Sequence, residues 1–385
     1  MQFQQRSDVL VNWTATNWGS TITANIPREF FLEGLMIMFK VTSTATCTPD
    51  FTGDFLAGIA DTIRLDVPTG STLRAPVNAS SSALLQYWRN TNGGLDRQTL
   101  AAADRAAQTT TAWQQAGREA YITIPVMFTP PNLDDPAASF FLLPLPRYSA
   151  NPTLTINVTN TGAAPAPFAT ANAPTLEYKI VMLRRWVDVP QFPVFDTEFN
   201  YIKLSFPNPG DNQYNEIPSP GVFTSLMFQT YKSDGRTVLP IIDQNIWANG
   251  SLTAQTGFSQ YKKFIELKFL GNTIRRLNPL DIQSIADWST DVGVNPYSVS
   301  NFDVGALGGN CMFWDFLSDR VGANAGEFGS ALDTNPLVGQ GSRVQLFMSP
   351  TYGTGGGSVV NMYYYRIFGD VSPLIRKFKP VAKKG

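Results

Sequence analysis

Ile26-Pro27 leads into an apolar segment containing Leu35-Met36, and Ile217-Pro218 leads at the same spacing to Leu226-Met227. The first copy begins at residue 26 and the second at residue 217, so 191 residues separate them. Solenoid repeats have periods of about 20 to 50 residues, which excludes that class here. The match therefore predicts a duplicated domain of roughly 190 residues, an ordinary domain size.

Two further matches follow in the same order. Gly70-Ser71-Thr72-Leu73-Arg74 recurs as Gly271-Asn272-Thr273-Ile274-Arg275, and Val187-Asp188-Val189-Pro190 resembles Gly369-Asp370-Val371-Ser372-Pro373. Each match is short, but their shared order and similar spacing favour duplication over coincidence. Gly70 and Gly271 are expected in matching turns, where a positive φ angle would favour glycine.

The composition indicates a globular chain with an unusually neutral surface. Hydrophobic residues make up 43% of the 385 residues, which is enough for a sizeable core. Charged residues make up only 15%, against about 25% in typical soluble proteins. The chain either buries much of its surface against copies of itself or presents neutral polar faces. The net charge of −1 favours neither nucleic acid nor membrane as a partner of the whole surface.

Catalytic and cofactor chemistry find little support. The chain has no histidine, which excludes His-dependent nucleophile systems and His-ligated metals. Cys47 and Cys311 could form a disulfide, although two buried free thiols are favoured. The glycine run 353–357 lacks the Lys of a phosphate loop, and Asp134-Asp135 is expected in a solvated loop. We expect no enzyme activity, no catalytic residue, no cofactor and no metal.

No apolar run approaches the roughly 18 residues of a membrane-spanning helix. The N-terminus lacks the pattern of a signal peptide, so we expect the protein to be made and used without Sec export.

The residue pattern is all-β. Short runs rich in Thr, Val, Ile, Phe and Tyr between turn residues predict strands: 30–42, 61–67, 121–128, 153–159 and 176–186 in the first half, and 201–206, 222–231, 262–270, 343–348 and 359–368 in the second. Short helices are expected at 80–90 and 280–289, and a longer one at 95–116. We expect a first domain over 1–190 that contains the helical insertion 95–116, a linker over 191–200 and a second domain over 201–385.

The C-terminal tail carries the densest positive charge of the chain. Five cations occur within ten residues: Arg376, Lys377, Lys379, Lys383 and Lys384. A frayed, solvated terminus would explain them. The alternative is contact with an anionic partner, either lipid headgroups or nucleic acid.

The duplicated all-β architecture resembles the double jelly-roll major capsid proteins of the tectivirus–adenovirus lineage. The resemblance covers nearly the whole chain and rests on architecture together with local features: Arg28 to Leu35 leading into a strand, Ile63-Arg64-Leu65-Asp66 before the Gly70 turn, Leu142-Leu143-Pro144, Tyr148 to Ile156, and the Ala-rich insertion 95–116. It implies two tandem eight-stranded jelly rolls with few short helices in loops.

The resemblance also implies a function in assembly. Members of this lineage form homotrimeric, nearly six-sided capsomers that tile an icosahedral virion shell, assembled in the host cytoplasm. Implied partners are other copies of the chain, penton or minor capsid proteins, and an internal membrane or genome beneath the C-terminal tail. The type that infects bacteria is the expected relative. Gln2 to Val11 is a weak candidate for the amphipathic N-terminal helix of some relatives.

A binding protein is the alternative. A viral spike or lectin-like tandem β-sandwich would use exposed aromatic residues on loops and need not form a lattice.

Overall fold

The computed structural model describes strands from both halves of the chain. The described residues are 3–44, 59–68, 72–77, 117, 119–128, 142–160, 173–187, 195–207, 213–217, 221–233, 235, 265–269, 272–277, 311–315, 332–334, 344–348 and 358–369.

Eight main strands of the first half form two antiparallel sheets around one core. Lettered B to I in chain order, they are β1 (Phe3–Thr16), β2 (Thr21–Asn25), β3 (Phe31–Thr42), β4 (Ala60–Asp66), β5 (Thr72–Val77), β6 (Glu119–Met127), β8 (Thr153–Val158) and β9 (Thr175–Val187). The sheet orders are β1-β9-β3-β6 and β2-β8-β4-β5, which are B-I-D-G and C-H-E-F. Two facing four-stranded sheets with this order make a jelly roll.

The second half repeats this topology strand for strand. Its strands B to I are β10 (Phe195–Phe206), β11 (Gln213–Glu216), β12 (Val222–Lys232), β13 (Ile265–Phe269), β14 (Asn272–Leu277), β15 (Cys311–Asp315), β17 (Val344–Met348) and β18 (Ser358–Gly369). The sheet orders are β10-β18-β12-β15 and β11-β17-β13-β14, again B-I-D-G and C-H-E-F. We call the two halves the first roll and the second roll.

Side-chain alternation explains how the first roll forms its core. Successive residues of a strand point to opposite faces of the sheet. In β3, Leu35, Ile37 and Phe39 are fully buried, whereas the residues between them are partly exposed. They meet Leu65 of β4 and Leu154 of β8, both fully buried, in one hydrophobic cluster. The core therefore lies between the two sheets.

Irregularities of the sheets recur at equivalent places. The pairing of strand D with strand I shifts between Leu32 and Gly34 in the first roll, and between Phe223 and Ser225 in the second. Both positions differ by 191 residues, which is the spacing predicted from the sequence. A β-bulge redirects a strand locally, so its repetition supports a duplicated fold more strongly than strand order alone.

A short extra strand also recurs beside strand D. β7 (Leu143–Pro144) pairs with β3, and β16 (Leu332–Asp333) pairs with β12. The only helical element within the described residues is a 3-10 turn, η3 (Leu145–Arg147), directly after β7.

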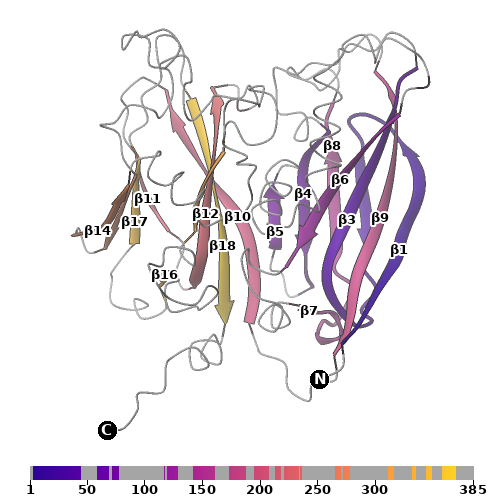
Figure 1. Ribbon diagram of the computed structural model, residues 1–385, viewed down its shortest axis with the longest axis horizontal. Coiled ribbons are helices and arrows are strands. Elements are labelled where there is room, and N and C mark those ends of the chain that lie inside the picture. Colours follow the sequence, from indigo (N-terminus) through magenta and orange to yellow (C-terminus); the bar gives the residue numbers. More distant parts are fainter. Residues whose placement is uncertain are drawn as a thin grey trace, which may run out of the picture.

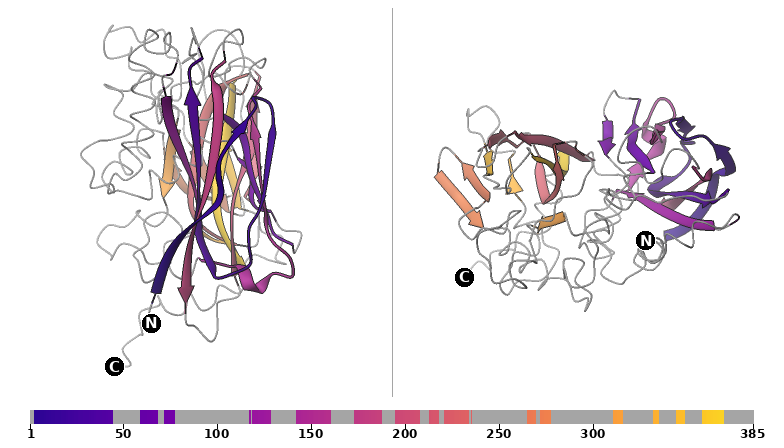
Figure 2. Two further views of the ribbon diagram at one scale, coloured as in Figure 1. Left: turned by 90° about the vertical axis from the view of Figure 1, so that its right-hand side faces the viewer. Right: turned by 90° about the horizontal axis from the view of Figure 1, so that it is seen from above.

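The two rolls stand side by side with strands in the same direction (Figure 1). They meet where β5 pairs with β10 in parallel, with Arg74 opposite Phe199. This pairing joins the C-H-E-F sheet of the first roll to the B-I-D-G sheet of the second. Seen from above, each roll is a separate ring of strands (Figure 2).

The strand predictions are confirmed for the central strands, with small differences at their ends. One expectation is wrong: Gln2 to Val11 does not begin a helix, because β1 is a strand from Phe3 to Thr16. Its hydrogen bonds to β9 hold this polar segment in extended form. β10 begins at Phe195, inside the stretch 191–200 expected as a linker. The helices expected at 80–90, 95–116 and 280–289 lie outside the described residues.

Candidate assembly surface

The junction between the rolls is lined by an aromatic face. On β18, Tyr364 contacts Phe223 at 5.8 Å between ring centroids. Tyr363, the preceding residue, points to the opposite face of the sheet and contacts Phe199 at 5.7 Å and Tyr201 at 5.3 Å. Because Phe223 has its equivalent, Leu32, in the core of the first roll, the Tyr363 side is the outer face of the B-I-D-G sheet.

This outer face is buried within the chain. Phe199 is 2% exposed, and Tyr363 and Tyr365 are 1% exposed. The Tyr365 hydroxyl donates a hydrogen bond to the carbonyl oxygen of Phe128, which follows β6 of the first roll. Together with the β5–β10 pairing, this contact shows that the first roll touches the outer face of the second.

The equivalent face of the first roll is open. Val9 lies opposite Val181 on strands B and I, as Tyr201 lies opposite Tyr363 in the second roll. Val9 is 54% exposed, and Val181 is partly exposed. An exposed apolar residue is common singly, but here it takes the place of a covered aromatic residue. The first roll therefore presents an uncovered version of the junction surface.

A polar and aromatic group occupies another part of this open sheet. Tyr121 of β6, 45% exposed, meets Trp13 of β1 edge to face at 5.9 Å between centroids. Lys40 Nζ lies 2.7 Å from Glu119 Oε1, and the Tyr121 hydroxyl donates to Glu119 at 2.9 Å. Hydrogen bonds from Lys40 and Tyr121 lower the pKa of Glu119, and the bond to Glu119 raises the pKa of Lys40. These charges are held by one another on the surface.

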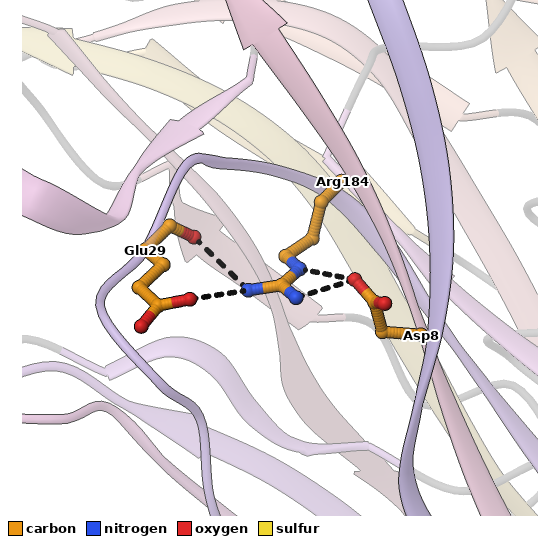
Figure 3. A network of polar contacts seen from close by, with 3 residues as sticks. All are labelled: Asp8, Glu29 and Arg184. Carbon is orange, nitrogen blue, oxygen red and sulfur yellow. Dashed lines mark hydrogen bonds and ion pairs between the residues drawn. The ribbon is translucent and has the colours of Figure 1, made fainter.

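A buried arginine joins three parts of the first roll (Figure 3). The Arg184 side chain on β9 is 7% exposed. Its Nε and Nη2 both donate to Asp8 Oδ2 on β1, with a distance of 2.8 Å for Nε. Its Nη1 lies 3.7 Å from the Glu29 carboxylate and donates to the Glu29 carbonyl oxygen at 3.5 Å. Arg184 therefore ties strands B and I to the turn before strand D.

The second roll has an arginine at the equivalent place. Arg184 lies opposite Leu32 of strand D, and Arg366 lies opposite Phe223, the equivalent of Leu32. Arg366 forms an ion pair with Glu198 on strand B, and Asn200 donates to the other Glu198 oxygen at 2.9 Å. Burial and the Glu198 charge raise the pKa of Tyr364 to about 12. We call the Arg184 and Arg366 groups the two arginine clamps.

The turn before strand D differs between the clamps. Phe30 has a φ of +66°, which is unusual for a bulky residue, and the Arg184 guanidinium carbon lies 5.1 Å from its ring centroid. The second roll has Gly221 at this place, 191 residues on. A Cβ at Gly221 would come within 2.6 Å of the Arg366 side-chain methylenes. Arg366 therefore fills the space that a side chain at Gly221 would need.

The residues singled out from the sequence are only partly covered. The turn glycines Gly70 and Gly271 and the basic tail residues lie outside the described residues, as do Asp134-Asp135 and Cys47. Of the described carboxylates and cysteines, no three are grouped so as to hold a metal ion. Within the described ranges, no helix has the length and apolar character needed to cross a membrane. The sequence analysis missed both clamps as recurring features.

No protein-family model matches the chain, and no curated protein matches its sequence. Solved structures do match. The major capsid protein P2 of bacteriophage PM2 aligns with a TM-score of 0.54 and 10% identity over 95% of this chain and 99% of that chain. A chain of the Sulfolobus turreted icosahedral virus structure gives 0.58 and 12% identity over 97% of both chains. A chain of the PBCV-1 virus capsid gives 0.54 and 11% identity over 95% and 94%.

The chain has a double jelly-roll fold. The fold expected from the sequence is confirmed by the strand order of both rolls and by end-to-end alignment with these structures. At identities of 10 to 12% the alignment concerns the fold, and the double jelly roll is what the chain shares with these capsid structures.

Proposed function

We propose that this double jelly-roll protein is a major capsid protein, that it has no enzymatic role, and that it assembles as a homotrimer. Three copies would bring six similar rolls together in a nearly six-sided capsomer, and such capsomers would tile an icosahedral shell. The domain boundary would lie between Val187 and Phe195, the end of β9 and the start of β10. The shell of a virion, assembled in the host cytoplasm, would be its location.

The observation that carries this proposal is the repetition of one complete jelly roll, in the same orientation, within a single chain. Two like rolls in each of three copies allow threefold symmetry to approximate a hexagon, which tiles a surface. The matched capsid structures have the same two-roll fold over nearly their full length. The low charge of the chain suits a surface that is largely covered by neighbouring copies.

The native mass tests the proposal. We expect light scattering coupled to size exclusion to give three times the chain mass of 42.3 kDa, unchanged on dilution. Electron microscopy of concentrated samples should then show hexagonal arrays. A stable single-chain mass would contradict the trimer and favour a tandem-sandwich binding protein, for which glycan screening would be the next experiment.

We further propose that the basic tail, Arg376 to Gly385, contacts an anionic interior partner, either a membrane or the genome. Deleting these ten residues should leave folding and trimer mass unchanged but reduce the yield of filled particles. Replacing the five cations with Gln provides a control of equal length. Normal yields of filled particles from both variants would contradict a role for the tail. Penton or minor capsid proteins would be further partners.

A further inference from the structure

Two strand edges remain open in the described sheets. β1 pairs with β9 alone, and β14 pairs with β13 alone. Their equivalents in the other rolls, β10 and β5, pair with each other and join the two rolls. The chain thus carries one completed junction and, at its two far sides, the two separate halves of a second junction.

We propose that the β14 edge of one copy pairs with the β1 edge of a second copy, repeating the β5–β10 junction between chains. The occupant of the open β1–β9 face is therefore a second copy of this chain. This inference rests on the proposed trimer and assigns the surfaces that form it. A head-to-tail contact of this kind uses two different surfaces and closes into a ring when its rotation permits.

The register of the contact follows from the completed junction. Phe199 lies opposite Tyr365 as Ser7 lies opposite Leu183, so Ser7 is the equivalent of Phe199. Arg74 lies opposite Leu65 as Arg275 lies opposite Leu267, on strands that share a bulge at this point. Since Arg74 and Phe199 are paired, the repeated junction places Arg275 of one copy opposite Ser7 of the next.

The open face has the character that such a contact needs. Val9 is 54% exposed on strand B, and its strand I neighbours Val181 and Leu183 are partly exposed. Their equivalents, Tyr201, Tyr363 and Tyr365, form the aromatic face at the completed junction. An exposed strand edge beside apolar side chains favours addition of another strand. Continuity with the existing junction is the reason to assign that strand to the same chain.

A cysteine pair tests the register. Directly opposite residues of paired strands have Cα atoms close enough for a disulfide, about 4.4 to 6.8 Å. In a background with Cys47→Ser and Cys311→Ser, mild oxidation of the Ser7→Cys/Arg275→Cys variant should give covalent dimers and trimers on non-reducing gels. Each single-cysteine variant is the matched control and should give no covalent trimer.

A charge on the open face tests the surface. Val9→Lys should shift the native mass from trimer to single chain, because it places an ammonium group at the apolar contact. Val9→Thr keeps the branched shape and should remain a trimer. Since Val9 is more than half exposed, the thermal unfolding of the Val9→Lys chain should confirm that it is folded.

The outcomes separate this inference from the proposed function. Covalent trimers together with a single-chain Val9→Lys variant support the inference. A wild-type trimer that neither cross-links at these positions nor responds to Val9→Lys overturns the inference and leaves the proposed trimer standing. A wild-type single chain overturns both.

Discussion

The two B-I-D-G sheets share their strand order, their bulge and a buried arginine, yet they differ in what covers them. In β3 of the first roll, buried residues alternate with partly exposed ones beyond the bulge. In β12 of the second roll, six consecutive residues from Leu226 to Tyr231 are buried. The difference teaches that topology sets which residues face the core, whereas the neighbouring roll sets whether the other face is buried.

The largest effect is expected from breaking the clamps, which the two rolls share. Arg366→Ala leaves Glu198, whose side chain is 10% exposed, without its guanidinium partner. Arg184→Ala does the same to Asp8, whose side chain is 18% exposed. Removing one partner of a buried ion pair costs about 3–5 kcal/mol. We expect both variants to lose stability on this scale in urea unfolding, with Arg366→Ala the more severe.

An exposed pair provides the control for the clamps. Arg64 Nε lies 2.8 Å from Asp66, but the Arg64 side chain is 50% exposed. Such surface pairs contribute about 0–1 kcal/mol. If Arg184→Ala were no more destabilising than Arg64→Ala, the clamp would not stabilise the first roll.

The comparison of the outer faces can be tested at one pair of equivalent methionines. Met227 of β12 is 2% exposed, whereas Met36, 191 residues earlier on β3, is partly exposed. Truncating a buried methionine costs about 2–5 kcal/mol. We expect Met227→Ala to fall in this range and Met36→Ala to cost clearly less. The Val9→Lys background removes contributions from other copies in both measurements, and equal losses would contradict the difference between the faces.

The sequence predicted the central strands because their apolar patterns are strong. Leu35-Met36 and Leu226-Met227 do occupy the same positions of strand D, where Leu35 and Leu226 are both fully buried. The residues Thr72 and Thr273 from the second match both lie at the start of strand F.

Edge strands were harder to predict, because one neighbour and one buried face leave a mixed pattern. β1 begins Phe-Gln-Gln-Arg-Ser-Asp, which contains few β-formers, and only its pairing with β9 makes it a strand. The first residues of β10 were assigned to a linker for a similar reason. Their burial depends on the neighbouring roll, which is remote in sequence.

The clamps were missed because the spacing between equivalent residues changes along the chain. Strand D positions differ by 191 residues, but Arg184 and Arg366 differ by 182, since the connections before strand I have different lengths. The match of Val187-Asp188 to Gly369-Asp370 already has the second spacing. Extending that match three residues toward the N-terminus would have found both arginines.

The smallest effect is expected on the open face of the first roll. Glu119 has a lowered pKa because Lys40 and Tyr121 donate hydrogen bonds to its carboxylate. A lowered pKa means that its stabilising contribution is present above the unfolded value near 4.5 and is lost as the pH falls through the folded pKa. Glu119→Gln should therefore be slightly less stable than the wild type near pH 7, and this difference should vanish by about pH 3. Thermal unfolding across this pH range measures it. A difference as large as that between Arg184→Ala and the wild type would mean that this face is buried after all, as its counterpart in the second roll is.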